Sequence, residues 1–129
     1  MKSFVVMLAV ASLCGCGGGG GGSTTAPPNQ GVNTTPPTGG ISVINNSFSP
    51  GTKTVAVGTN LQWAWNTCTG DTYSGQTCVS HSVTFDDGSS SSPLQDQGTF
   101  NKTFNAAGTF TYHCSVHGAA MTGTITVTQ

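Results

Sequence analysis

Apolar and polar residues alternate with a period of two along most of the chain from residue 41 onward, and Gly, Asn and Pro interrupt the runs. This alternation predicts short strands with one buried face, and no segment shows the 3.6-residue period of an amphipathic helix. We expect strands near residues 41–48, 52–57, 60–66, 81–86, 98–104, 108–114 and 121–128. About seven or eight short strands of this kind indicate an all-β fold, a Greek-key β-sandwich.

The apolar side chains on these strands supply an adequate core for a small domain, although a domain of this size is marginal on burial alone. Leu61, Trp63 and Trp65 share one face of a single strand. The other expected core residues are Val55, Val57, Phe100 and Phe104.

The N-terminus has the features of an export signal. Lys2 precedes an apolar run from Phe4 to Leu13, which is too short to span a bilayer. The next residues, Leu13-Cys14-Gly15-Cys16, resemble a bacterial lipoprotein signal in which cleavage before Cys16 leaves that cysteine lipidated. Residues 1–16 are then the signal peptide, and the alternative is ordinary secretion. Either way we expect the domain in the periplasm or at the cell surface, where disulfides persist.

Residues 17–40 are rich in Gly, Thr and Pro and have little apolar surface to bury. This composition predicts a disordered linker. The folded domain is therefore expected to span residues 41–129, with a lipid anchor at Cys16 as its only link to a membrane.

The charge of the chain is low, with 5% charged residues and no arginine. Proteins that bind nucleic acid through its phosphates need a basic patch, so we expect no nucleic-acid partner.

Cys68 and Cys78 flank a polar loop, TCTGDTYSGQTC, ahead of the strand that begins at His81. In an oxidising compartment we expect a disulfide that stabilises the fold by about 2–3 kcal/mol. The alternative is a redox-active or metal-binding pair, but the spacing is not C-x2-C and no helix start is near.

Four soft or borderline metal ligands lie near strand ends: His81, Cys114, His117 and Met121. Strand alternation puts three of them on buried faces, and His117 follows in the loop after Cys114. The buried-face partners are Val83 and Phe85 for His81, Phe110 and Tyr112 for Cys114, and Ile125 and Val127 for Met121. Ser82 and Thr84 are expected to face the other way, out of the core. His113 points outward, and we expect it to be solvated or, alternatively, to line a partner contact or an electron path.

Taken singly, a buried Cys is commonly inert and a buried Met commonly fills space in a core. Together, the four residues match a metal site. Structural zinc sites do not usually include Met, and calcium and magnesium prefer oxygen ligands. Two imidazoles, one thiolate and a weak axial thioether are typical of a blue-copper electron-transfer site.

The chain resembles a cupredoxin of the plastocyanin/azurin family over residues 41 to 129. The similar segments are NSFSPGTKTVAVGTNLQWAW, HSVTFDDG and GTFNKTFNAAGTFTYHCSVHGAAMTGTITV. The resemblance implies one copper ion, cycling between Cu(I) and Cu(II), with His81, Cys114, His117 and Met121 as ligands. The spacing from His117 to Met121 is one residue shorter than in plant plastocyanin. Ser82 stands where family members often have Asn, and we expect it to hydrogen-bond to the ligand loop.

We therefore expect a monomeric carrier of single electrons that docks transiently with redox proteins near His117, through the small residues Gly118, Ala119 and Ala120. The alternatives are a copper-binding or delivery protein and a structural module without a working metal site. Multicopper oxidases and copper nitrite reductases need more histidines than the three in this chain, so we expect no enzymatic activity.

Overall fold

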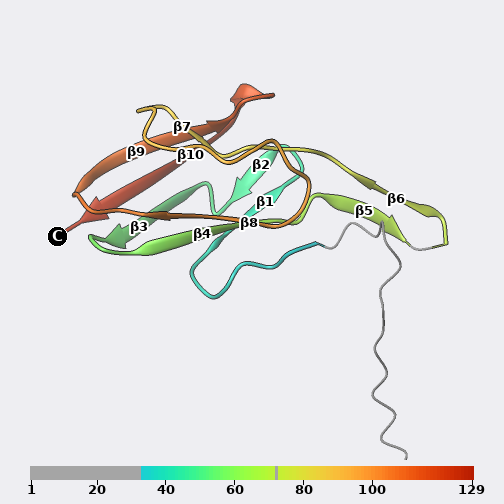
Figure 1. Ribbon diagram of the computed structural model, residues 1–129, viewed down its shortest axis with the longest axis horizontal. Helices are drawn as coiled ribbons and strands as arrows, with labels where there is room; N and C mark the ends of the chain where they lie inside the picture. Colours follow the sequence, from blue (N-terminus) through green and yellow to red (C-terminus); the bar gives the residue numbers. More distant parts are fainter. Residues whose placement is uncertain (1–32, 72) are drawn as a thin grey trace, which may run out of the picture.

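The computed structural model describes residues 33–71 and 73–129, which form ten strands and no helix (Figure 1). The strands are β1 (Ile41–Ile44), β2 (Ser47–Ser49), β3 (Thr52–Ala56), β4 (Asn60–Trp65), β5 (Cys68–Asp71), β6 (Gly75–Cys78), β7 (Thr84–Phe85), β8 (Thr99–Thr103), β9 (Gly108–Cys114) and β10 (Gly118–Thr128). In the described part of the chain nothing has the helical length and apolar character needed to cross a bilayer. The expected signal peptide, Cys16 and residues 17–32 of the expected linker lie outside the described residues.

Eight of the strands build two four-stranded sheets. One sheet has the order β2-β1-β4-β8 and the other the order β3-β10-β9-β7. Strands β1 and β4 are parallel, as are β3 and β10, and the other neighbours within these sheets are antiparallel. Strands β5 and β6 form a separate hairpin that extends to one side of the molecule (Figure 1). The all-β fold predicted from the alternating pattern is confirmed.

Aromatic side chains from both sheets meet in the core. The ring of Trp63 on β4 packs edge-on against Phe85 on β7 and Tyr112 on β9, with centroid distances of 5.8 and 5.5 Å. Phe48 and Phe104 extend the cluster at 4.7 Å from Tyr112 and 6.0 Å from Phe85. Because such pairs form only when the two sheets pack face to face, the cluster fixes how the sheets are stacked.

Several expected strands differ from the structure in extent: β10 begins three residues earlier than expected, other ends shift by one residue, and two strands differ most. The expected strand 41–48 is divided into β1 and β2 by a turn at Asn46, whose φ of 61° lies in the left-handed region that Asn tolerates. The expected strand 81–86 is reduced to β7, and His81 instead forms an isolated bridge with Gln95.

Two residues differ from the prediction in burial. Val57 was expected in the core but is 39% exposed, because β3 ends one residue before it at the edge of its sheet. Ser82 was expected to face away from the core together with Thr84, yet it is buried. Its surroundings belong to the site described next.

Candidate metal centre

His81 is held by its backbone rather than by a regular strand. Its N–H donates to the carbonyl of Gln95 at 2.8 Å, and its own carbonyl accepts from the N–H of Gln95 at 3.1 Å. The same carbonyl accepts a second hydrogen bond, of 3.0 Å, from the indole Nε1 of Trp65. The side chain of His81 is fully buried. Three hydrogen bonds on one peptide segment leave this imidazole little freedom to move.

Cys114 ends β9, and His117 lies in the connection from β9 to β10, where two tight turns follow one another. The N–H of His117 donates to the carbonyl of Cys114, and the N–H of Ala120 donates to the carbonyl of His117, both at 3.1 Å. Gly118 has a φ of +51° between these turns, where a residue with a side chain would be strained. The pairing of β10 with β9 shifts register between Gly118 and Thr122, as in a β-bulge. Bulges commonly re-aim a side chain near a functional site.

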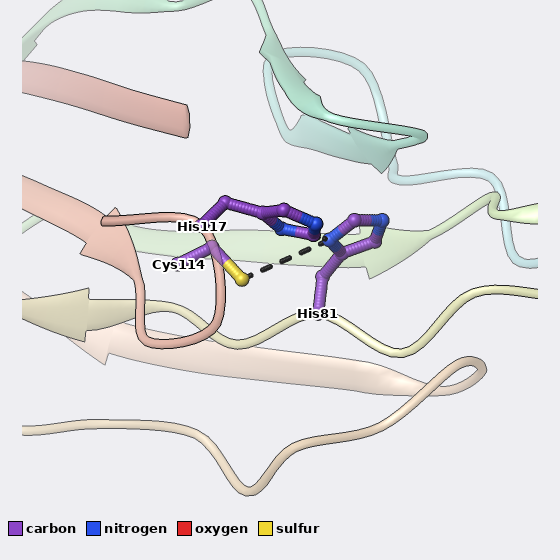
Figure 2. Close-up of side chains that lie close together, drawn as sticks. All are labelled: His81, Cys114 and His117. Carbon is purple, nitrogen blue, oxygen red and sulfur yellow. Dashed lines mark hydrogen bonds between the residues drawn. The ribbon is translucent and has the colours of Figure 1, made fainter. Parts of the chain in front are cut away.

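The side chains of His81, Cys114 and His117 converge on one point (Figure 2). Their ligand atoms all lie within 4.8 Å of one another. Nδ1 of His81 is 3.2 Å from Nδ1 of His117 and 3.7 Å from Sγ of Cys114. These are the only three His, Cys, Asp or Glu side chains among the described residues that converge in this way.

The nitrogen–nitrogen separation of 3.2 Å and the separation of 3.7 Å between Sγ and Nδ1 of His81 match the ligand shell of a single ion. Around a tetrahedral ion with bonds of about 2.0 Å to nitrogen and about 2.3 Å to sulfur, two nitrogens lie about 3.3 Å apart and a sulfur lies about 3.5 Å from each nitrogen. The donor set is one thiol and two imidazoles, which copper and zinc both accept. The geometry therefore fits one transition-metal ion between these three residues.

Met121 lies on β10 immediately beyond the loop, and it is buried with Cys114 in the core cluster. It shares the inward face of β10 with Gly123, Ile125 and Val127. Its assignment as the fourth ligand stays a prediction from the sequence.

Burial prepares His81 to act as a neutral ligand. Desolvation lowers the pKa of its imidazole below the ordinary 6.5, and the neighbouring His117 lowers it further. Its Nε2 lies on the far side of the ring from the sulfur (Figure 2) and has no hydrogen-bond partner among the described residues. Nδ1 is therefore the ring nitrogen that faces Cys114 and His117, and it would bind a metal ion in the tautomer that carries its proton on Nε2.

The sulfur of Cys114 accepts a hydrogen bond from the backbone N–H of Ser82 at 3.4 Å. An N–H directed at sulfur stabilises the negative charge of a thiolate, which is the form that binds metals.

The hydroxyl of Ser82 connects the segment of His81 with the loop of Cys114. It accepts from the N–H of Ser115 at 2.9 Å and donates to the hydroxyl of Ser115 at 2.9 Å. Thr84 lies at hydrogen-bonding distance on its other side, 3.1 Å away. Ser82 is buried because these bonds satisfy its hydroxyl, although strand alternation predicted that it would face outward.

His113 faces away from the other two histidines, on the outer side of β9. Its Nδ1 pairs with Oδ1 of Asp86, so it is not simply solvated as expected from the sequence. Hydrogen bonds from Thr111 and His113 hold the pKa of Asp86 below its ordinary value.

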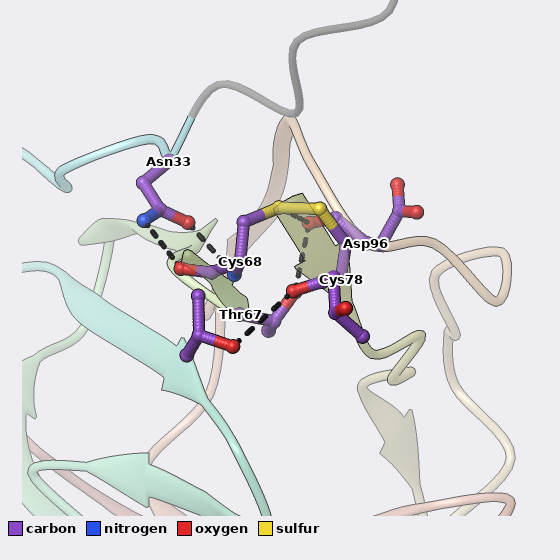
Figure 3. The surroundings of a disulfide bond; sticks show 7 residues. Asn33, Thr67, Cys68, Cys78 and Asp96 are labelled. Atoms are coloured by element: carbon purple, nitrogen blue, oxygen red, sulfur yellow. Dashed lines mark hydrogen bonds between the residues drawn. A yellow bond between two sulfur atoms is a disulfide. The ribbon is translucent and has the colours of Figure 1, made fainter. Parts of the chain in front are cut away.

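Cys68 and Cys78 form a disulfide at the base of the β5–β6 hairpin (Figure 3). The side-chain amide of Asn33 bonds to both backbone groups of Cys68, donating to its carbonyl at 3.0 Å and accepting from its N–H at 2.9 Å. The N–H of Thr34 donates to the carbonyl of Trp65 at 2.7 Å. Residues 33 and 34, which were expected in the linker, thus contact the domain beside the disulfide.

Sequence reasoning missed the supporting roles of Trp65, Gln95 and Asn33. Each acts through a hydrogen bond to a backbone group that lies far away in the sequence, and such contacts leave no periodic signal.

Comparison with known proteins places these features in context. The profile of the family described as "Copper binding proteins, plastocyanin/azurin family" matches residues 41–128. No curated protein sequence matches the chain. Among solved structures, the chain is similar to a purple cupredoxin from Nitrosopumilus maritimus, at 25% identity and a TM-score of 0.50, over 63% of this chain and 81% of that one.

Two further solved structures share the fold. A mutant fern plastocyanin matches at 23% identity and a TM-score of 0.54, over 68% of this chain and 98% of that one. A copper-containing nitrite reductase from Thermus scotoductus matches at 20% identity and a TM-score of 0.57, over 81% of this chain but 25% of the reductase.

Proposed function

The chain belongs to the plastocyanin/azurin family of copper-binding proteins, and on that premise we propose that it carries single electrons between extracytoplasmic redox proteins. Cupredoxins bind one copper ion and are generally electron-transfer proteins. The observation that supports the proposal most directly is the approach of Cys114, His81 and His117 to within 4.8 Å of one another.

In this proposal His81 and His117 hold the copper through Nδ1 and Cys114 holds it through Sγ, with Met121 as a weaker fourth ligand. Bound copper supplies a one-electron couple, Cu(I)/Cu(II), for which a thiolate, a thioether and imidazoles are together a suitable ligand set.

The protein's contribution is to keep its ligands in place while the charge of the site changes. The backbone of His81 is fixed by Gln95 and Trp65, and the sulfur of Cys114 receives the N–H of Ser82. A site whose groups are held before the reaction needs little rearrangement when an electron arrives or leaves. Cys114, Met121 and His81 are buried, so the core also keeps water from three of the four proposed ligands.

His117 is the proposed ligand with exposed surface, because its side chain is partly buried whereas the others are fully buried. The neighbouring Ala119 and Ala120 are exposed and carry small side chains. A partner can therefore approach this imidazole closely, and small, transient contacts of this kind suit repeated turnover.

Two features favour a carrier over the other functions considered. The chain has three histidines in total, and His113 pairs with Asp86, so no histidine remains for the second copper centre of a nitrite reductase or oxidase. Buried ligands with fixed backbones also release a metal slowly, which does not suit copper delivery.

We also propose that the protein lies outside the cytoplasm, lipid-anchored through Cys16. The export-like N-terminus supports this location, as does the disulfide between Cys68 and Cys78, since disulfides are rare in the cytoplasm. Mass spectrometry of the mature N-terminus tests the anchor.

The proposed function is tested by adding Cu(II) to the apo-protein and recording visible absorption and electron paramagnetic resonance spectra during a redox titration. We expect one copper per chain, an intense thiolate-to-copper band and a reversible one-electron couple. Cys114→Ser should abolish the band while the apo-protein still folds, as judged by its thermal unfolding. Copper that binds without a thiolate band, or that passes readily to an acceptor apoprotein, contradicts the proposal.

A further inference from the structure

The β5–β6 hairpin contributes almost nothing to the core. Every described residue between Cys68 and Cys78 is exposed, and the described parts of the two strands pair only with each other. An isolated two-stranded hairpin is marginally stable at best in water. Burial of apolar surface therefore does not explain why this hairpin is ordered.

The hairpin is nevertheless held firmly at both ends. At its base are the Cys68–Cys78 disulfide and the two hydrogen bonds from Asn33 (Figure 3). At its tip the carboxylate of Asp71 accepts from the N–H groups of Tyr73 and Ser74, at 2.8 and 2.6 Å. These contacts reduce the entropy lost when the hairpin binds something, which is how preorganisation raises affinity.

The base of the hairpin lies next to the proposed copper site. Cys78 precedes His81 by three residues, a span of at most about 10 Å. The other strand of the hairpin is tied to the same region. Thr67, which precedes Cys68, donates its hydroxyl to the carbonyl of Asp96, and Asp96 follows the Gln95 that pairs with His81. Four residues per strand, at about 3.3 Å each, carry the tip about 13 Å beyond the disulfide.

Large exposed hydrophobic side chains gather at the end of the molecule that carries the hairpin and the proposed copper site. The described residues include five of them, and four lie on the hairpin or on segments next to the proposed ligands: Tyr73, Val79, Leu94 and Val116. Tyr73, at the hairpin tip, is 99% exposed. The fifth, Val57, follows β3 and bonds to Thr128 near the far end of β10.

We propose that the β5–β6 hairpin is a docking arm whose Tyr73 anchors a redox partner protein. This inference rests on the proposed electron-carrier function. The partner would have an uncharged, apolar patch opposite His117 and Val116, with a pocket beside it that receives the ring of Tyr73. Tyrosine is enriched among the residues that dominate binding at protein interfaces, because its ring is large and loses little conformational entropy.

A protein fits this surface better than a lipid bilayer does. The hairpin carries no lysine or arginine to attract anionic headgroups. Its one charged group is Asp71, and the hydrogen bonds from Ser74 and Tyr73 hold the pKa of its carboxyl below the ordinary value. The tip is therefore negatively charged at neutral pH, which opposes binding to anionic lipids.

The test compares three copper-loaded proteins in stopped-flow measurements: the wild type, Tyr73→Ser and the control Val57→Ser, which removes an exposed hydrophobic side chain away from the copper end. Each reduced protein is mixed with hexacyanoferrate(III), and separately with periplasmic and membrane extracts of the organism that produces it. In each reaction Cu(I) loses one electron and the oxidant gains one. Binding to vesicles of phosphatidylcholine and phosphatidylglycerol is measured by co-sedimentation.

We expect Tyr73→Ser to lower the rate of oxidation by the extract about tenfold, while its rate with hexacyanoferrate and its reduction potential stay unchanged. Val57→Ser should match the wild type, and Tyr73→Phe should recover most of the lost rate. If Tyr73→Ser and the wild type are oxidised by the extract at equal rates, the docking role of the hairpin is overturned, whereas the electron-carrier function is not. Vesicle binding that Tyr73→Ser abolishes would overturn it in favour of a membrane contact. A wild type that reacts with hexacyanoferrate but with no component of the extract would overturn the carrier function, and the docking arm with it.

Discussion

The indole Nε1 of Trp65 donates a hydrogen bond of 3.0 Å to the backbone carbonyl of His81, across a sequence separation of 16 residues. Trp65 ends β4 in one sheet, whereas His81 leads into β7 in the other. The bond therefore ties a proposed copper ligand to the opposite sheet, and it makes the position of His81 depend on the packing of the whole core.

Trp65→Phe tests this link. The substitution removes the hydrogen bond and part of a buried side chain, so we expect the free energy of unfolding to fall by about 2 kcal/mol. The copper spectrum should shift as well, because His81 gains freedom to move. Trp63→Phe is the matched control, since Trp63 is also buried in β4 but does not bond to His81. Denaturant unfolding and absorption spectra of both variants check the prediction, which fails if the two copper spectra are the same.

Ser82→Ala should loosen the connection between the two ligand segments. The variant loses the hydroxyl that bonds to both the N–H and the hydroxyl of Ser115, but it keeps the backbone N–H that faces Cys114. We expect a loss of about 1 kcal/mol in stability, a measurable change in reduction potential and retention of the thiolate band. Ser82→Thr restores a hydroxyl and serves as the comparison. An unchanged potential in Ser82→Ala would show that these bonds do not influence the copper.

The stability of the apo-protein should fall as the pH drops through about 6.5. Because burial and His117 lower the pKa of folded His81 below 6.5, the unfolded chain binds a proton there that the folded chain does not. The free energy of unfolding then decreases as the pH falls, and a His81→Gln variant should show a shallower decrease. Thermal unfolding of both apo-proteins between pH 8 and 5 measures the difference, and parallel profiles contradict the assignment.

Gly123→Ala should be strongly destabilising. A Cβ at this position would lie 2.2 Å from Cζ of Tyr112, whose ring is packed in the core and cannot move aside. We expect a loss of about 3 kcal/mol or more. The control is Gly51→Ala, where the added Cβ meets only the carbonyl of Phe48 at 3.6 Å. Urea unfolding of the two variants should differ clearly, and similar midpoints would contradict the packing described for Tyr112.

The alternating pattern predicted the sandwich because burial determines most of its strands. It also placed His81, Cys114 and Met121 on the inward side, where the structure has them. The pattern was wrong about Val57 because alternation does not show where a strand ends, and wrong about Ser82 because hydrogen bonds can bury a hydroxyl. The division of the strand expected at 41–48 did have a signal, the Asn45-Asn46 pair, since Asn is common in turns.

The β5–β6 hairpin could not be predicted in the same way. Its segment, TCTGDTYSGQTC, has no apolar alternation, and none of the side chains that the structure describes between the cysteines enters the core. A disulfide and the amide of Asn33 hold it instead, and Asn33 lies 35 residues from Cys68. Contacts between distant polar residues become visible only once the chain is folded.

The contact between Asn33 and Cys68 also determines how the molecule would be oriented on a solid support. The chain enters the fold beside the disulfide, at the copper end, whereas β10 leads away from the copper loop for 11 residues toward the C-terminus (Figure 1). That strand is about 36 Å long. A protein attached to an electrode directly at residue 33 would therefore turn its copper toward the metal surface and exchange current readily. Attachment through Gln129 would place most of the domain between the copper site and the electrode surface, and the current would be correspondingly weak.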